Sequence, residues 1–246
     1  MSVAGSVPFG DESKRLLMGV STATLTTQLF KRGLRNVFMS GLRPLNPAAA
    51  RFAAPAFTLR FIPAREDVDQ LAVFQDREHP QRRAIETIPA GHALVMDCRR
   101  ETRAASAGDI LITRLIVRGA AAIVTDGGLR DTPELAALAF PVFCAAPAAP
   151  LNLVLHHAAD VNVPIGCAGV PVYPGDVLVG DAEGVVVIPQ ALADEVARDS
   201  VEQERMERFV ILKVRKGAPL PGTYPPGEAT MADYRRWVAA GEPADW

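Results

Sequence analysis

The sequence predicts an α/β fold arranged as one large domain, and three observations support this. Short apolar runs bounded by Gly or Pro, typical of buried strands, occur at residues 91–97, 120–125 and 140–144. Helical apolar stripes alternate with them, at residues 106–118 and after the Thr132-Pro133 pair, which is typical of a helix start. With 246 residues, of which 49% are hydrophobic, the chain is long enough to bury a sizeable core in a single domain, 1–246.

Composition excludes several classes of function. The net charge of −2 and the lack of a like-charge block argue against a nucleic-acid-binding surface. No stretch approaches the ~20 apolar residues of a membrane span, and no secretory signal is recognised. The cysteines, Cys98, Cys144 and Cys167, form no Cys-x-x-Cys pair, which favours a reducing compartment over disulfides or zinc. We therefore expect a cytoplasmic protein that binds neither nucleic acid nor membrane.

The first third of the chain predicts helix, then strand, then a polar connection. Residues 1–12 are expected to be a lead-in, followed by helical periodicity over 13–35. Gly19 interrupts this pattern, and Ser21 or Thr22 is placed to cap a second helix. A Pro/Ala/Arg-rich passage over 42–55 leads into a strand at 56–62. The charged residues 65–86 predict a loop and a short helix.

The last third predicts short strands and then helices. A glycine, an apolar run and an aspartate recur in the same order at 91–97 and 175–181, which indicates a repeated turn–strand device. Residues 161–188 predict several short strands, and 190–216 a long helix. A Pro/Gly-rich C-terminal tail, 217–246, follows and ends in a short helix, where Thr230 and Asp233 have capping-box spacing.

The stretch 117–131 predicts a ligand site. A buried strand ends at the Gly127-Gly128 turn, directly before Arg130 and Asp131. Ligands gather at the carboxyl ends of strands in α/β proteins. A guanidinium suits a carboxylate, and an aspartate suits Mg²⁺ or Mn²⁺. The plainer interpretations are a surface ion pair for Arg130 and a helix N-terminal acid for Asp131.

Other polar residues divide into one further candidate site and several structural positions. Residues 108–111 begin a helix, where free amide groups suit an anion, although an ordinary capped helix would look the same. Asp126 is expected to cap a turn, and His156 and His157 to be structural. Cys167, between glycines, is expected to be a small buried residue.

Taken together, these motifs resemble those of the RraA-like family, which includes divalent-metal-dependent 4-hydroxy-4-methyl-2-oxoglutarate aldolases. The resemblance covers roughly residues 90–190, and the Gly-Thr-Tyr-Pro-Pro sequence at 222–226 suggests the longer subgroup named ribonuclease activity regulators. It rests on these segments: Gly-Asp-Ile-Leu at 108–111, Arg-Gly at 118–119, Thr-Asp-Gly-Gly at 125–128, Arg-Asp at 130–131, Val-Pro-Ile-Gly at 163–166 and Pro-Gly-Asp at 174–176.

The resemblance implies a swivelling β/β/α sandwich with flanking helices, assembled as a homotrimer or homohexamer with active sites between subunits. It assigns substrate-binding backbone amides to the loop formed by Gly108, Asp109, Ile110 and Leu111. Arg130 would grip the carboxylate of a 2-oxo acid, and Asp131 would ligate Mg²⁺ or Mn²⁺. Asp109 would lie near the water shell of the metal and complete the catalytic set. A neighbouring subunit would supply a glutamate, for which Glu202 and Glu204 are the candidates.

The implied function is a metal-dependent aldolase that cleaves a 4-hydroxy-2-oxo acid to pyruvate through a metal-stabilised enolate, with oxaloacetate decarboxylase activity. No lysine lies between Phe61 and Arg205, which disfavours a Schiff-base aldolase. Residues 24–29 and 77–79 depart from the family pattern and leave the rest of the substrate open. Two alternatives remain: a non-catalytic inhibitor of a ribonuclease acting by protein contact, and a sugar-acid dehydratase using the same metal site.

Overall fold

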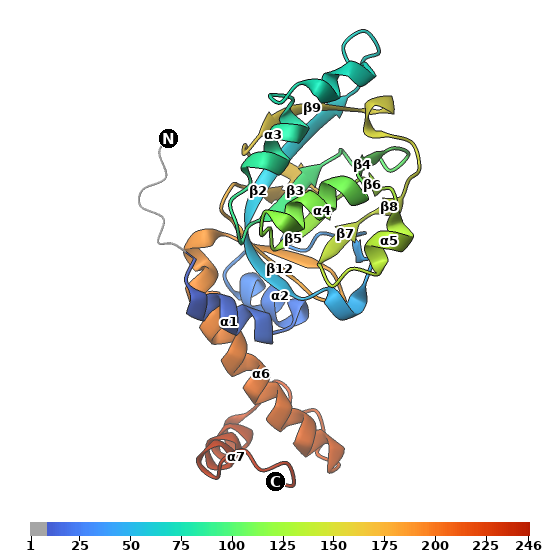
Figure 1. The fold of residues 1–246 in the computed structure, drawn as a ribbon. Helices are drawn as coiled ribbons and strands as arrows, with labels where there is room; N and C mark the ends of the chain where they lie inside the picture. Colours follow the sequence, from blue (N-terminus) through green and yellow to red (C-terminus); the bar gives the residue numbers. More distant parts are fainter. Residues whose placement is uncertain (1–8) are drawn as a thin grey trace.

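The computed structural model, described for residues 9–246, is organised around an eight-stranded sheet (Figure 1). The strand order is β1-β7-β5-β3-β2-β12-β13, and β9 also pairs with β2. Strands β2, β3, β5 and β7 are parallel to one another, and the remaining pairs are antiparallel. The strands are β1 Arg43–Pro44, β2 Phe52–Pro63, β3 Ala93–Asp97, β5 Ala122–Thr125, β7 Val142–Cys144, β9 His156–Val161, β12 Val177–Gly180 and β13 Val185–Ile188. This arrangement confirms the predicted α/β class.

Strand β2 connects the two halves of the sheet. Its first residues, 52–55, pair with β12, and residues 56–60 pair with β3. The strand therefore begins at Phe52, so the predicted strand start at residue 56 was wrong, and residues 52–55 of the Pro/Ala/Arg-rich passage belong to β2. Pro55 is the last residue paired with β12, so its missing N–H falls where that ladder ends. The alternation of side chains along these strands supplies both faces of the sheet with apolar residues.

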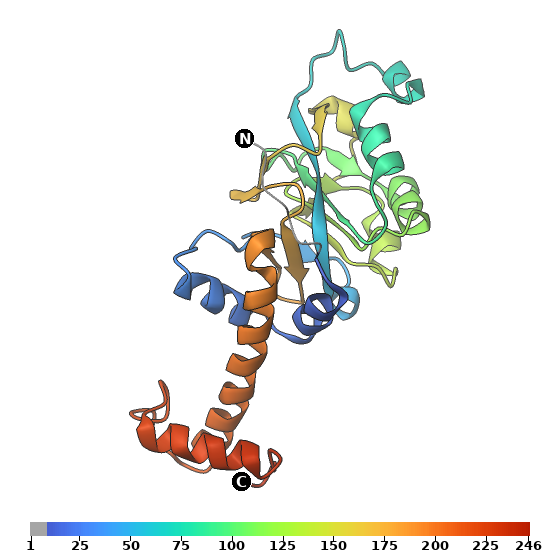
Figure 2. The same ribbon diagram turned by 90° about the vertical axis from the view of Figure 1, so that its left-hand side faces the viewer.

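Three helices cover one face of the parallel strands (Figures 1 and 2): α3 Pro80–Thr87, α4 Asp109–Val117 and α5 Thr132–Ala136. A short hairpin, β10 Ile165–Cys167 and β11 Val170–Val172, packs on the opposite face. Helices α1 Asp11–Gly19, α2 Thr22–Lys31 and α6 Ala193–Arg215 pack against β12 and β13. The 3-10 turns are η1 Pro47–Ala49, η2 Leu71–Gln75, η3 Asn152–Val154 and η4 Gln190–Leu192.

Several predicted boundaries hold, and others shift. Ser21 caps α2 by accepting a hydrogen bond from the Thr24 amide, as one of the two predicted caps. Helix α1 begins at Asp11, inside the predicted lead-in, of which residues 1–8 lie outside the described part. Helix α4 begins at Asp109, within the helix start predicted at residues 108–111. The N-cap of α5 is Asp131 rather than Thr132.

Helix α6 carries the C-terminal helix α7, Glu228–Ala239, away from the sheet (Figure 2). The long helix confirms the prediction for residues 190–216. Phe209, Tyr234 and Trp237 form a small apolar cluster that joins α6 to α7. The predicted capping box is wrong, because the Thr230 hydroxyl donates to the Gly222 carbonyl and Asp233 pairs with Lys213. In residues 9–246 no helix is long and apolar enough to cross a membrane.

Candidate functional site

A small three-stranded sheet brings the two predicted site segments together. Its strands are β4 Ala105–Ala107, β6 Gly128–Leu129 and β8 Ala146–Pro147. Strands β4 and β6 are parallel, so the residues that follow them emerge at the same edge. The Arg130 amide donates to the Ala107 carbonyl at 3.1 Å, which fixes the two strand ends side by side. Gly108 and the Arg130-Asp131 pair, remote in sequence, therefore form one site.

Gly108 is required by the close approach of the two segments. A Cβ atom at this position would lie 2.5 Å from Asp131 Oδ2 and 2.7 Å from Arg130 Cγ. The Asp109 amide donates to Asp131 Oδ2 at 3.2 Å, and the Ile110 amide donates to Asp109 Oδ1 at 2.7 Å. Two of the helix-start amides that the family resemblance assigns to substrate are thus bonded to the site's own carboxylates.

Asp131 is held as a carboxylate close to a cation. Its Oδ1 lies 3.4 Å from Arg130 Nε, and its backbone adopts the left-handed conformation with φ of 57°. Burial raises the pKa of Asp131, but the Asp109 amide and the Arg130 guanidinium more than offset this, and the pKa lies below its usual value. The side chain of Arg130 is 48% exposed and that of Asp131 29%, so both remain open to a ligand.

These residues line a cavity of about 250 Å³. The cavity also contains residues that sequence reasoning missed. Gln81 and Arg82 come from α3, Asn152 begins η3, and Phe74 and Leu151 supply apolar wall. No motif marks them: Gln81 and Arg82 belong to the charged stretch 65–86. The full lining is Phe74, Gln81, Arg82, Ala105–Ala107, Gly108, Asp109, Ile110, Leu111, Arg130, Asp131, Leu151 and Asn152.

The donor set suits a hard divalent ion. Asp131 and Asp109 present two carboxylates to the same cavity, and Mg²⁺ or Mn²⁺ characteristically takes one or two carboxylates and keeps several waters. In residues 9–246 no group of three or more His, Cys, Asp or Glu residues is placed to hold a metal, which does not match a closed structural zinc site. The residues present therefore fit an ion that relies on water and substrate oxygens.

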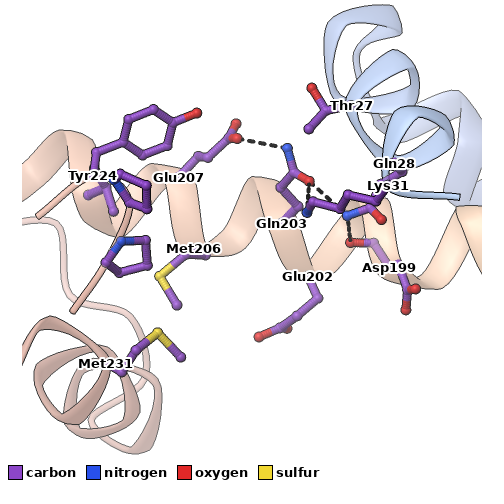
Figure 3. Close-up of a pocket in the computed structure, with 13 residues that line it drawn as sticks. Thr27, Gln28, Lys31, Asp199, Glu202, Gln203, Met206, Glu207, Tyr224 and Met231 are labelled. Carbon is purple, nitrogen blue, oxygen red and sulfur yellow. Dashed lines mark hydrogen bonds between the residues drawn. The ribbon is translucent and has the colours of Figure 1, made fainter. Parts of the chain in front are cut away.

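The two glutamates predicted to act from a neighbouring subunit lie elsewhere in the chain. Glu204 Oε1 accepts from the Ser21 amide at 2.6 Å, and Glu202 accepts from the Tyr234 hydroxyl at 2.6 Å. Neither lines the cavity, and Glu202 instead lines a groove formed by α2, α6 and the C-terminal segment that contains Tyr224 and Met231 (Figure 3). Gln28, from the segment that departs from the family pattern, lines the same groove. Their role across a subunit interface stays a prediction.

Asp126 has a structural position, as predicted. It accepts hydrogen bonds from the amides of Cys98, Arg100 and Ala168, and burial raises its pKa. It thereby ties the turn after β3 to the hairpin β10–β11.

The remaining candidates are also structural. His156 is buried, with Nε2 3.2 Å from the Ala104 carbonyl, and burial lowers its pKa. His157 Nδ1 lies 2.7 Å from Asp69 Oδ1. Cys167 is free and buried, as are Cys98 and Cys144. These groups lie outside the cavity lining and are fully accounted for by packing and local hydrogen bonds.

Gly108→Ala is expected to damage the site while leaving the fold intact. The new methyl group must displace the Asp131 carboxylate or the Arg130 side chain, and a misplacement of about 1 Å is enough to lower turnover at least tenfold. Steady-state kinetics and thermal unfolding would measure the two effects separately. Gly166→Ala is the matched control, because a Cβ there meets nothing within 4 Å. Equal activity of the two variants would contradict the assignment.

The sequence model of the RraA-like family, described as Aldolase/RraA, matches residues 22–187. The chain belongs to the RraA-like family. The match includes Gly108–Leu111, Arg130 and Asp131, and it ends before α6, so Glu202, Glu204 and α7 lie outside it.

Two similar sequences carry aldolase names. A protein of Halalkalibacterium halodurans named "Putative 4-hydroxy-4-methyl-2-oxoglutarate aldolase" is 33% identical over 172 residues, covering 70% of this chain and 75% of that protein. A 4-hydroxy-4-methyl-2-oxoglutarate aldolase of Thermus thermophilus is 31% identical over 141 residues, covering 57% of this chain and 77% of that protein.

A solved structure shows the same RraA-like fold. Streptomyces coelicolor RraAS2, described as an unusual member of the RNase ES inhibitor RraA protein family, superposes with a TM-score of 0.72 at 29% identity. The likeness covers 82% of this chain and 97% of RraAS2. The relatives of this RraA-like chain therefore include proteins named as aldolases and a protein described as a member of an inhibitor family.

Proposed function

We propose that this RraA-like chain is a divalent-metal-dependent pyruvate aldolase that cleaves a 4-hydroxy-2-oxo acid and also decarboxylates oxaloacetate. One observation carries the proposal: a helix-start loop, a guanidinium and an ionised carboxylate lie together in one cavity. This combination suits a 2-oxo acid, because cationic and N–H donors bind its carboxylate and a neighbouring aspartate can hold a metal next to its 2-oxo oxygen. The aldolase names of the similar proteins support the same reaction class.

The residues have separate roles in this proposal. Arg130 offers its guanidinium to the substrate carboxylate, with N–H groups of the loop 108–111 on the other side. Because Asp131 already accepts from the Asp109 amide, a substrate carboxylate competes with Asp131 for that donor. Asp131 would hold the metal, and Asp109 would lie near the water shell of the ion. When bound, a divalent ion supplies Lewis-acid stabilisation of negative charge developing on the 2-oxo oxygen.

Retro-aldol cleavage breaks the C3–C4 bond. The C4 hydroxyl gives up its proton and becomes an aldehyde or ketone, and the electron pair passes to C3, which takes up a proton to give pyruvate. No lysine lies between Phe61 and Arg205 to form a Schiff base. Asp109 lines the cavity and is the proposed group for moving a proton near the reacting carbons.

Metal removal tests this proposal. Pyruvate should form from oxaloacetate and from 4-hydroxy-4-methyl-2-oxoglutarate with Mn²⁺ or Mg²⁺, and EDTA should abolish it until the ion is restored. A coupled lactate dehydrogenase assay follows the product. The control is the spontaneous decarboxylation of oxaloacetate by the same concentration of free metal. Turnover that persists in EDTA, or no turnover of any 2-oxo acid with Mn²⁺, would contradict the proposal.

A second candidate function is inhibition of a ribonuclease by protein contact, which the likeness to RraAS2 favours. The small net charge of −2 leaves direct RNA binding unsupported, so inhibition would require contact with the enzyme itself. Cleavage of a labelled RNA by RNase ES, with and without this protein, tests it. Inhibition that survives Asp131→Asn would favour this function. Loss of pyruvate formation in the same variant would show that the inhibition does not depend on the proposed aldolase activity.

A further inference from the structure

The cavity contains two buried amide groups that its own chain does not satisfy. Gln81 is 2% exposed and Asn152 5% exposed, and both line the cavity. Gln81 Oε1 and Asn152 Nδ2 are buried and have no hydrogen-bond partner among the described residues. Buried polar atoms are nearly always paired, so an unpaired acceptor and an unpaired donor on two residues that line one cavity call for a partner, and a ligand group that reaches them would supply it.

The geometry around β4 fixes which end of Gln81 is free. Gln81 Nε2 donates to the Ser106 carbonyl at 2.7 Å, and reversing the amide would place two oxygens together. Asn152 approaches β4 through η3, where the Ala105 amide donates to the Pro150 carbonyl at 2.8 Å. Both amides therefore flank the strand that leads into Gly108. They line the same cavity as Arg130 and Asp131, which are proposed to hold the pyruvate part of the substrate.

We propose that Gln81 and Asn152 bind a hydroxyl group of the fragment that leaves, so that the preferred substrate is a sugar-derived 2-oxo acid with a free hydroxyl beyond C4. This inference rests on the proposed aldolase function. A hydroxyl is the group that matches both amides, because it donates one hydrogen bond, to Gln81 Oε1, and accepts another, from Asn152 Nδ2. A carboxylate matches only Asn152 Nδ2, since a carboxylate oxygen cannot donate a hydrogen bond to Gln81 Oε1.

Arg82 is the cation of this part of the cavity. Its guanidinium lies 4.4 Å from the Phe74 ring centroid, and within residues 9–246 it forms no ion pair. Stacking on Phe74 satisfies part of its charge. We therefore assign Arg82 to the wall of the subsite. The competing possibility, that Arg82 binds a second carboxylate of the substrate, is one of the outcomes of the test.

Two substrates that differ by one hydroxyl group give the sharpest test: 4,5-dihydroxy-2-oxopentanoate and 4-hydroxy-2-oxopentanoate. The wild-type kcat/KM ratio of the first to the second should be at least about tenfold, because the second leaves both amides unpaired. The near-isosteric variants Gln81→Met and Asn152→Leu should each bring the ratio close to one. Gln28→Met is the matched control, a buried glutamine outside the cavity, and should keep the wild-type ratio.

Oxaloacetate serves as a reference substrate, because it releases carbon dioxide rather than an aldehyde when it forms pyruvate. Pyruvate from oxaloacetate together with a wild-type ratio near one, or a ratio unchanged in both variants, would overturn this inference and leave the aldolase proposal standing. A preference for 4-hydroxy-2-oxoglutarate that disappears in Arg82→Met would also overturn it, in favour of a second carboxylate. If no pyruvate formed from any substrate, oxaloacetate included, both this inference and the aldolase proposal would be overturned.

Discussion

Asp131→Asn is expected to lower kcat/KM for pyruvate formation at least about 1,000-fold, or roughly 4 kcal/mol of transition-state stabilisation. The amide keeps the shape of the side chain, and its oxygen can still accept from the Asp109 amide. What is lost is the negative charge that would hold the metal. The variant should therefore fold normally, with a thermal unfolding midpoint close to that of the wild type.

The control for Asp131→Asn is Asp160→Asn, which removes an aspartate that pairs with Arg60 outside the cavity. Its activity should stay within about twofold of the wild type, because exposed ion pairs contribute little. Kinetics with saturating Mn²⁺ and circular dichroism on the same samples give the comparison. An Asp131→Asn enzyme within tenfold of the wild type would contradict the metal assignment.

Arg130→Ala is expected to raise KM for a 2-oxo acid about 100-fold, because a charge-assisted, bidentate contact with the carboxylate is lost. Arg130→Lys should recover only part of this, since an ammonium keeps the charge without the planar fork. Initial-rate kinetics over a wide substrate range separate KM from kcat.

The matched control for Arg130→Ala is Arg60→Ala. Arg60 is 45% exposed and Arg130 48% exposed, and each contacts an aspartate, but Arg60 lies outside the cavity. Arg60→Ala should leave KM unchanged. If Arg130→Ala lowered kcat with no change in KM, Arg130 would have another role, in turnover rather than in binding the carboxylate.

Sequence reasoning predicted the part of the candidate site that is marked by local chemistry, and the structure brings those residues into one cavity. Gly108 stands at a helix start, and Arg130 and Asp131 follow a glycine turn, so each carries a signal within a few residues. Gln81 and Asn152 carry no such signal, because only the fold brings them next to β4 and into the lining of the cavity. Their unpaired atoms become visible only when every buried donor and acceptor is accounted for.

The same contrast between local sequence signals and distant contacts applies to the strands of the fold. The apolar runs that became β3, β5 and β7 were recognised from composition and from the glycine or proline residues beside them. The start of β2 was missed because residues 52–55 were grouped with the Pro/Ala/Arg-rich passage, and only the change of partner from β12 to β3 explains the place of Pro55 in a strand. The strand β4 was not predicted, because its three residues pair only with a distant segment.

The central claim is that this cavity binds a divalent ion and a 2-oxo acid together through Asp131 and Arg130. Titration of Mn²⁺, with free ion counted by electron paramagnetic resonance, measures this directly with and without pyruvate. We predict one ion per chain in the wild type, tighter binding when pyruvate is present, and loss of the site in Asp131→Asn. Equal Mn²⁺ binding by wild type and Asp131→Asn, with no effect of pyruvate, would contradict the claim.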